Sequence, residues 1–189
     1  MKNSFYICLL LFTFLISCGS DDAREPLFAE EDNSAELFFS EYVEGSSFNK
    51  ALEIVNLTGS SINLAEQAYS IKKQSNGEGN WGGELLLTGS IANNQVYVIA
   101  NENSTHPDIL NKASLLKAGS PMDFNGNDAI GLFRNGVLID VIGFLDDPED
   151  FGKDVTLRRR PEITEPSVTY DPNQWDLFDI DNIEDLGSY

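Results

Sequence analysis

Carboxylates are the side chains of this sequence with the clearest capacity for chemistry. Glu41 and Glu53 lie in two successive apolar segments, 37–43 and 51–56, whose residues favour β-strands. If these strands are neighbours, both carboxylates can lie on one face, where Asp140 of a later segment could join them. Oxygen ligands of this kind bind Ca²⁺, and paired carboxylates also act as acid and base in glycoside hydrolysis. Glu41, Glu53 and Asp140 are therefore our candidate metal or hydrolase site.

A structural role is the favoured alternative for these three carboxylates, because no binding-loop spacing accompanies them. Each could cap a turn or accept a hydrogen bond from the backbone at the end of a strand. Two denser acidic stretches, 146–150 and 171–181, lack the glycine of the calcium-binding loop, so we interpret them as a solvated acidic rim. We expect no cofactor, and weak Ca²⁺ binding is left open as an alternative.

Histidine and cysteine are scarce, which argues against most other catalytic centres. His106 is the only histidine of the sequence, and Cys8 and Cys18 are its only cysteines. Zinc sites and most acid–base or nucleophilic centres need more of these residues than the chain offers. The sequence also contains no G-x-S-x-G motif to present a serine nucleophile. We therefore predict that the protein is not an enzyme.

Exposed aromatic residues and one basic cluster are the candidates for binding. Phe48 lies in a serine-containing loop and Trp81 in a glycine-rich loop, and aromatic loop residues on a rigid scaffold often form binding surfaces. Either ring could instead cover an end of the fold. On a strand, Arg158 and Arg160 would point one way and Arg159 the other. Arg158 and Arg160 could contact a polyanion or an acidic sugar, although salt bridges with the acidic surface are the favoured alternative.

The strongest signal for an element that positions these residues is the segment 124–143, FNGNDAIGLFRNGVLIDVIG. Its Asn135-Gly136 pair lies between two apolar runs and predicts a two-residue hairpin, because a type I′ turn needs a positive φ at both central residues. A regular register would place Gly131 opposite Asp140. Such a pair predicts a polar, half-open position on an otherwise apolar hairpin.

Short strands separated by turn residues recur along the rest of the chain, and the only helical pattern, at 107–116, is weak. Ser104 or Thr105 is available to cap that helix. About eight short strands of this kind predict an all-β fold, an antiparallel β-sandwich. The further strands are expected at 62–64, 69–73, 85–87, 95–101 and 155–159.

The charge of the chain limits its partners. The sequence has 31 acidic and 12 basic residues, which gives a formal net charge of -19. Nucleic-acid binding requires a basic surface that neutralises phosphates, so we consider nucleic acid an unlikely partner.

The first 17 residues resemble a lipoprotein signal peptide. A basic residue precedes an apolar stretch, 5–16, that is too short to span a membrane. Leu15-Ile16-Ser17-Cys18 resembles a bacterial lipobox, which implies cleavage before Cys18 and lipidation of that residue. An ordinary secretory signal with a chance cysteine is the alternative. Cleavage would also remove Cys8, so the mature chain would have no disulfide.

The residues after Cys18 suggest the cellular location of the protein. Ser20, Asp21 and Asp22 resemble the short acidic tag that directs some lipoproteins of diderm bacteria to the cell surface. We therefore expect the protein in the outer membrane, anchored by lipid and exposed at the cell surface, with a periplasm-facing anchor as the alternative. Residues 18–36 are rich in acidic and small side chains and are predicted to form a lipidated acidic tether. Residues 37–189 would form the domain.

Four segments of that domain resemble the lamin-tail domain family, in the family's order. The resemblance implies an immunoglobulin-like antiparallel β-sandwich over residues 37–189. Spaced aromatic residues in the tail, Tyr170, Trp175 and Phe178, predict that the C-terminal tail packs on it. The stretch 144–151 departs from the family, because it is acidic where we associate a Gly/Trp-rich link with the family. The segments are 37–56, 87–101, 124–143 and 154–161, and the tail 174–189 also resembles bacterial members.

The same resemblance implies a non-catalytic role. Bacterial members occur alone or fused to hydrolases and are thought to attach or position them. We therefore predict a surface-exposed lipoprotein that binds or scaffolds a protein or glycan partner at the cell envelope. A divalent-metal-dependent hydrolase or calcium-binding module that uses Glu41, Glu53 and Asp140 is the alternative. A third possibility is nucleic-acid binding by analogy with nuclear lamins.

Overall fold

The structure of the chain is a computed structural model that describes residues 34–189. The expected signal peptide, the lipidation residue Cys18 and the export-tag residues Ser20, Asp21 and Asp22 lie outside the described residues. Among the residues that are described, no helix is long and apolar enough to cross a membrane.

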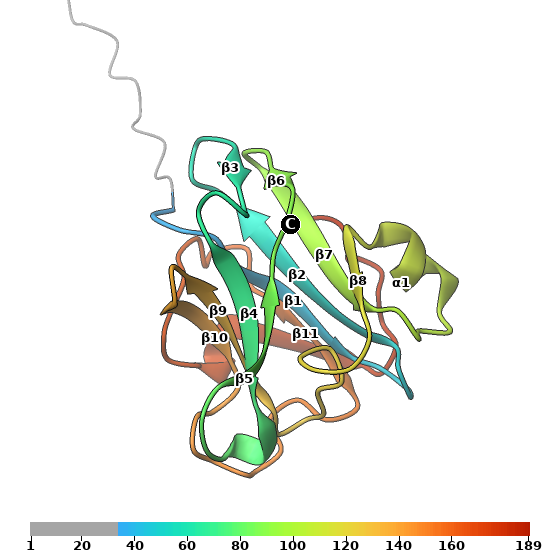
Figure 1. Cartoon of the computed structure of the whole chain (residues 1–189). Helices are drawn as coiled ribbons and strands as arrows, with labels where there is room; N and C mark the ends of the chain where they lie inside the picture. Colours follow the sequence, from blue (N-terminus) through green and yellow to red (C-terminus); the bar gives the residue numbers. More distant parts are fainter. Residues whose placement is uncertain (1–33) are drawn as a thin grey trace, which may run out of the picture. The chain divides into compact units, whose positions relative to one another are not determined.

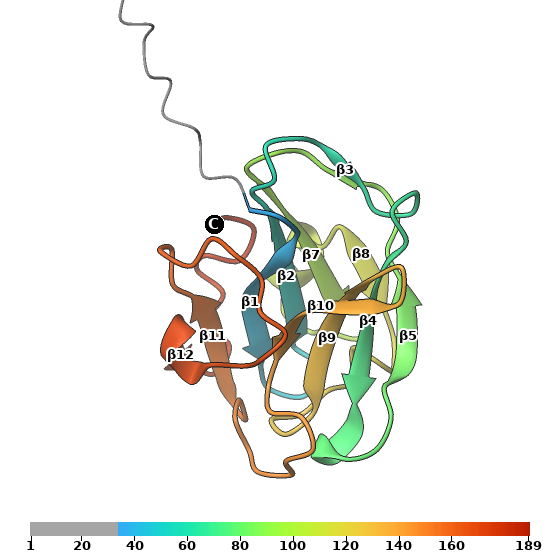
Figure 2. The same cartoon turned by 90° about the vertical axis from the view of Figure 1, so that its left-hand side faces the viewer.

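Within residues 34–189, twelve strands form three sheets (Figures 1 and 2). All strand pairs are antiparallel except β7 and β8. The six-stranded sheet has the order β12-β11-β1-β2-β7-β8, formed by β1 (Phe38–Glu44), β2 (Lys50–Asn56), β7 (Gln95–Asn101), β8 (Leu115–Lys117), β11 (Val155–Arg159) and β12 (Trp175–Asp179). The four-stranded sheet has the order β10-β9-β4-β5, formed by β4 (Tyr69–Gln74), β5 (Gly82–Leu86), β9 (Ala129–Arg134) and β10 (Val137–Ile142).

The remaining elements are small. Strands β3 (Ile62–Asn63) and β6 (Ser90–Ile91) pair with each other, and the helices are α1 (Pro107–Lys112), η1 (Ser75–Gly77) and η2 (Pro172–Gln174). The prediction of an all-β sandwich is confirmed. The strand count exceeds the predicted eight because β6 and β8 have only two and three residues, too few for a periodic pattern, and because no strand was predicted in the tail, where β12 forms.

The two larger sheets enclose a buried apolar core between them (Figure 2). Leu52 and Ile54 of β2 reach this core at alternate positions, as the period of two in a strand requires. They meet Ile71 of β4 and Leu132 of β9 from the facing sheet. Each such side chain contributes about 1.5–3 kcal/mol when it is fully buried, so this core is the main source of stability.

The outer face of the six-stranded sheet is covered as well. Val43, Ala51 and Val98 pack there against Ile109 of α1 and against the C-terminal segment 180–189. All residues of β1 and β2 are consequently buried. Burial on both faces explains why the sequence of β1 shows no alternation of apolar and polar residues.

The hairpin of β9 and β10 forms at the predicted turn, but its register differs from the prediction. The residues of the Asn135-Gly136 turn have φ values of 50° and 75°. The strands pair as predicted up to Leu138, after which a bulge shifts the register and pairs Gly131 with Val141. The predicted pair of Gly131 and Asp140 is therefore wrong. The turn fixes only the residue pairs next to it. Farther along, the bulge adds one residue to β10 and so shifts the later pairs.

The predicted helix at 107–116 is shorter than expected. Helix α1 ends at Lys112, and the residues from Leu115 onward form β8, which pairs in parallel with β7. The expected cap from Ser104 or Thr105 does not form, because His106 is the N-cap residue and its side chain makes no capping hydrogen bond. Pairing with a neighbouring strand outweighs the weak helical propensity of this segment.

Candidate functional site

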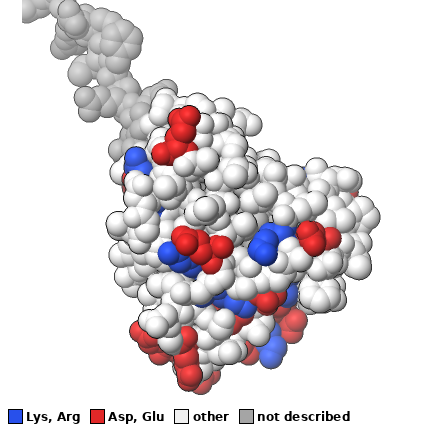
Figure 3. All heavy atoms as spheres, in the orientation of Figure 1, with Lys and Arg blue, Asp and Glu red and all other residues white. Residues whose placement is uncertain are grey.

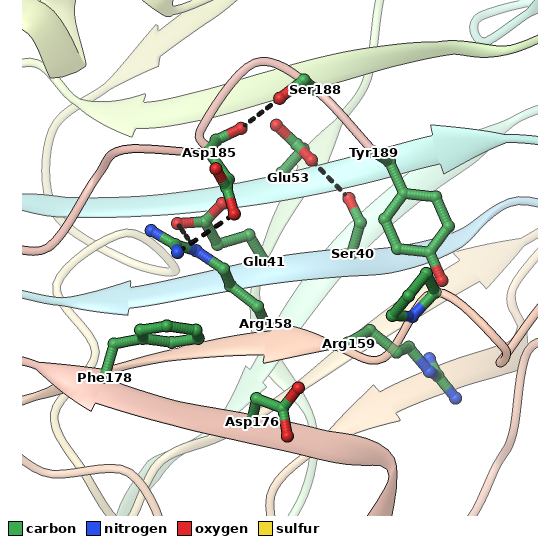
Figure 4. Close-up of a pocket in the computed structure, with 11 residues that line it drawn as sticks. Ser40, Glu41, Glu53, Arg158, Arg159, Asp176, Phe178, Asp185, Ser188 and Tyr189 are labelled. Atoms are coloured by element: carbon green, nitrogen blue, oxygen red, sulfur yellow. Dashed lines mark hydrogen bonds and ion pairs between the residues drawn. The ribbon is translucent and has the colours of Figure 1, made fainter.

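A hollow of about 320 Å³ lies on the outer face of the six-stranded sheet, beside the C-terminal segment 180–189 (Figure 4). We call it the outer-face pocket. Strands β1, β2, β11 and β12 supply one part of its wall, and the end of the chain supplies the other. Its lining includes Glu41, Glu53, Arg158, Phe178, Asp185 and Tyr189.

Strand register brings the two predicted glutamates together. Glu41 of β1 pairs directly with Glu53 of β2. Their neighbours Tyr42 and Leu52 point into the core, so both glutamates point outward. A register shift after Phe39 adds one residue to β1 and sets this phase. The expectation that Glu41 and Glu53 share one face therefore holds in the structure.

Both carboxyl groups are buried with few hydrogen-bond donors. Glu41 is 1% exposed, and its hydrogen bond in the described part of the chain comes from Nε of Arg158 at 3.4 Å. Glu53 is fully buried and accepts the hydroxyl of Ser40 at 2.7 Å and the backbone N–H of Gly187 at 2.5 Å. Glu53 is therefore tied to the C-terminal segment, whereas Glu41 depends on one long contact.

The guanidinium of Arg158 is shared among several partners. Besides Glu41, it contacts the carboxylate of Asp185 at 3.1 Å and lies 4.1 Å from the centre of the Phe178 ring. It also donates to the side chain of Asn182. Its position between two carboxylates fits the prediction of a salt-bridge role for this basic cluster.

Burial raises the pKa values of both glutamates. Desolvation raises the pKa of Glu41 to about 8, against the attraction of Arg158 and with a further contribution from Glu53. Desolvation raises the pKa of Glu53 to about 7, against the hydrogen bonds from Ser40 and Gly187. At neutral pH the pair therefore retains protons, because the surrounding positive charge is insufficient to ionise both groups.

The end of the chain forms the outer wall of the pocket. The hydroxyl of Tyr189 donates to the carbonyl oxygen of Ile163 at 2.6 Å, and its ring meets Phe38 edge-on at 5.8 Å. Ile183 and Leu186 are buried against the sheet. Sequence reasoning expected the tail to pack on the domain, but it missed Asp185 and Tyr189, because nothing in the sequence showed that the tail would cover Glu41 and Glu53.

Asp140 does not join the two glutamates, contrary to the predicted trio. Its carboxylate is fully buried and accepts the backbone N–H groups of Phe39 and Ser167, each at 2.8 Å. It also forms a 2.7 Å ion pair with Arg159. The Arg159 side chain points away from Glu41 and Glu53, as the alternation of side chains along a strand predicts. Across residues 34–189, no group of three His, Cys, Asp or Glu side chains is arranged to hold a metal ion.

The other predicted binding residues lie apart from the two glutamates. Phe48 is 49% exposed in the loop between β1 and β2. Trp81 is half-buried and meets Phe133 edge-on at 5.2 Å, so it covers part of the four-stranded sheet. Arg160 forms a partly exposed ion pair with Asp176 at 3.0 Å.

A second hollow, of about 310 Å³, lies beside the acidic loop 146–150. We call it the Phe144 groove. Phe144, Leu145 and Val168 are 38%, 38% and 53% exposed there, and Tyr170 meets Phe144 edge-on at 5.1 Å. Figure 3 shows acidic side chains gathered at the bottom of the view, where the loop after β10 and the η1 turn lie. The sequence showed the acidity of this loop but gave no sign that Val168 and Tyr170 pack beside it.

Comparison with known proteins identifies one family. The family model described as Lamin Tail Domain matches residues 30–146, which is more than half of the chain. The match spans the strands from β1 to β10, whereas β11, β12 and the C-terminal segment lie beyond it. The outer-face pocket therefore combines strands inside the matched range with residues outside it. A search of the curated proteins finds no match.

Proposed function

The chain belongs to the lamin tail domain family, and from this premise we propose that it is a non-catalytic lipoprotein that binds or scaffolds a protein or glycan at the cell surface. The observation that carries the proposal is the order of the segments along the sequence. A lipobox-like Leu15-Ile16-Ser17-Cys18 and an acidic tag precede an immunoglobulin-like module. A lipid on Cys18 would anchor the module in the outer membrane, and the tag at Asp21 and Asp22 would direct it outward.

The surface of the module supports a binding role. A rigid sandwich presents loops at fixed positions, which suits recognition of a partner. The Phe144 groove exposes apolar side chains next to an acidic loop, and Phe48 exposes a further ring. Apolar groups gathered on a surface are more typical of contact sites than single exposed residues are.

Two other functions have less support. A calcium-dependent or hydrolytic site would need Asp140 beside Glu41 and Glu53, but Asp140 is engaged with Arg159. Nucleic-acid binding would need a basic surface, whereas the net charge is -19.

Changing Asp21 and Asp22 to alanine tests whether the acidic tag directs the protein to the cell surface. We expect the variant to lose sensitivity to protease added to intact cells while it remains in the membrane fraction. Replacement of Cys18 by alanine should release the protein from that fraction. The matched control is Asp179→Asn, an exposed acidic change within the domain that should leave both results unaltered. Unchanged protease sensitivity in the Asp21/Asp22 variant would show that the export-tag interpretation is wrong.

A pull-down from the native envelope tests the binding role. The wild-type module should retain a protein or glycan that a Phe144→Ser/Val168→Ser variant, altered in the Phe144 groove, retains poorly. A module that retains no envelope component, although it is displayed and folded, would contradict the binding role.

A further inference from the structure

We propose that the outer-face pocket binds a primary ammonium group, from a free amine or a lysine side chain, which displaces one proton from the pair Glu41 and Glu53. The proposal names the ligand chemistry of one site on the module and takes its biological setting from the proposed binding function. Three observations support it: the balance of charges around the pocket, the incomplete hydrogen bonding of Glu41, and the apolar walls.

Carboxylates outnumber cations around the pocket. Two pairs are satisfied separately: Arg160 faces Asp176, and Arg159 faces Asp140. Without these, the charged groups that face the cavity or act on its glutamates are Glu41 on β1, Glu53 on β2, Arg158 on β11, Asp185 in the C-terminal segment and Lys112 on α1.

Of these two cations, Arg158 contacts Glu41 and Asp185 directly. Lys112 donates instead to the carbonyl oxygen of Ile183 at 3.3 Å. The charges around the pocket thus lack one positive charge. Without a bound cation, the glutamates retain protons.

Glu41 is also short of hydrogen-bond donors. A buried carboxylate is normally stabilised by two or three donors at 2.7–3.2 Å, roughly, whereas the Arg158 contact is longer, at 3.4 Å. Glu41 lines the cavity although its side chain is only 2% exposed. An ammonium group carries three N–H donors on a compact charge, which is what this carboxyl group lacks.

The walls of the pocket suit the carbon chain of an amine. Phe178, Pro161 and Tyr189 line the cavity with apolar surface, and Tyr189 is 43% exposed. The methylene groups of a lysine side chain can lie along such surface while the charged end reaches a polar group. A volume of about 320 Å³ is at the lower end of ligand pockets, which suits one side chain or one small amine.

A metal ion fits the pocket less well than an ammonium group. Ca²⁺ takes about six to eight oxygen ligands, and the described residues offer no cluster of three metal-binding side chains. Arg158 already occupies the space between the carboxylates of Glu41 and Asp185. Its fixed positive charge opposes a divalent ion more than it opposes a monovalent one.

The exchange of protons for ammonium has a measurable signature. Each proton released per bound ligand makes the affinity rise about tenfold per pH unit. The pKa values of about 7 and about 8 place this dependence between the ordinary glutamate range and mildly alkaline pH. The ligand itself stays charged throughout, because the ordinary lysine pKa is about 10.4.

Calorimetric titration of the full chain in detergent tests the proposal. The probes are cadaverine, Nα-acetyl-lysine methylamide and an acetylated peptide with one internal lysine, each in two buffers that differ in ionisation enthalpy. We expect millimolar or tighter binding with proton release, and an affinity that rises about tenfold from about pH 6 to about pH 7. Binding of cadaverine alone identifies a free amine as the ligand, whereas binding of the peptide identifies a lysine of a protein partner.

Glu41→Gln keeps the shape of the side chain but cannot release a proton. It should lower the affinity at least tenfold and flatten its pH dependence. If thermal melting shows that Glu41→Gln does not fold, Glu53→Gln gives a second test. Glu184→Gln, an exposed change in the same C-terminal segment, should bind like the wild type.

With the amine probes, three results would overturn the proposal: no binding at millimolar probe, binding independent of pH, or equal binding by Glu41→Gln. Calcium chloride is the competing probe, and proton release by Ca²⁺ without any by amines would also overturn it. Failure here leaves the proposed function separately testable, because the surface-display and pull-down experiments do not involve the two glutamates.

Discussion

Arg159 and Asp140 show what single residues contribute to this domain. Their ion pair is almost completely buried, and Asp140 also accepts two backbone N–H groups. The sequence predicted that Arg159 would point away from Arg158, because strand residues alternate between faces. It could not identify Asp140 as the partner, since that contact joins strands far apart in the chain and depends on a bulge in β10. Spacing therefore predicted the direction of each side chain but not its partner.

The same limit applies to the outer-face pocket. Glu41 and Glu53 were predictable as neighbours, because they lie on consecutive strands of one hairpin. Their raised pKa values were not predictable, because burial in the folded protein causes them. Burial of this kind depends on tertiary packing that no local pattern reports.

We predict that the stability of the protein falls as the pH rises from about 5 to about 8. Because the pKa values of Glu41 and Glu53 are raised in the folded state, that state binds more protons than the unfolded chain in this range. Their stabilising contribution is complete below the unfolded pKa and is lost as the pH rises through about 7 and about 8. We expect a decrease of about 2 kcal/mol or more in the free energy of unfolding, since one pKa unit corresponds to about 1.4 kcal/mol.

Urea unfolding across this pH range measures the effect. Glu41→Gln should flatten the dependence and stabilise the protein at the alkaline end, and Glu184→Gln should leave the curve unchanged. Asp181, whose pKa is lowered by hydrogen bonds from Ser46 and Asn49, titrates below this window and does not mask the result. Stability that increased with pH would contradict the assignment of raised pKa values.

At the scale of elements, the β9–β10 hairpin shows that the residues of the turn fix its position, whereas packing fixes the strand register farther along. The Asn135-Gly136 turn was predictable, because few residue pairs adopt two consecutive positive φ values easily. The later register was not, because a bulge depends on the surroundings of both strands. Gly131 was expected to face Asp140 at a half-open polar position. It lies instead close to the rings of Trp81 and Phe133.

This packing predicts the effect of adding a single methyl group to the hairpin. In Gly131→Ala, the new Cβ would lie 2.7 Å from side-chain atoms of Leu138 and Phe133 and 3.0 Å from the Trp81 ring. We expect destabilisation of about 1–3 kcal/mol, because the crowded side chains must shift. Urea unfolding, followed by tryptophan fluorescence, would report it. Gly82→Ala is the matched control, since a Cβ there meets nothing within 4 Å, and equal stability of the two variants would contradict this packing.

At the scale of the whole molecule, the described domain has a core between its sheets and a second apolar cluster outside them. The sequence predicted the sandwich, because short strands and turn residues recur throughout the chain. It also predicted that the tail packs on the domain, but not that this segment and α1 would cover the outer face of the six-stranded sheet. That segment combines acidic residues with single apolar ones, so no periodic pattern marks it. Only the folded sheet provides the surface on which Ile183 and Leu186 pack.

The final prediction concerns this outer cluster. In Ile183→Ser/Leu186→Ser, two side chains that are 8% and 2% exposed are lost from the sheet. Each contributes about 1.5–3 kcal/mol by burial, so we expect a loss of about 3–6 kcal/mol in the free energy of unfolding. That loss is large against a typical total of about 5–15 kcal/mol, and the variant should melt at a much lower temperature than the wild type.

The outer cluster and the core can be distinguished by hydrogen exchange. If the C-terminal segment detaches while the sandwich persists, amides in β4 and β9 should stay protected and the Gly187 amide, which donates to Glu53, should exchange rapidly. The matched control is Ile180→Ser, because Ile180 lies in the same segment but is 41% exposed and should cost little. Equal stability of the double variant and this control would show that the segment does not hold the outer face. Loss of protection throughout β4 and β9 would instead show that the outer layer and the core unfold as one unit.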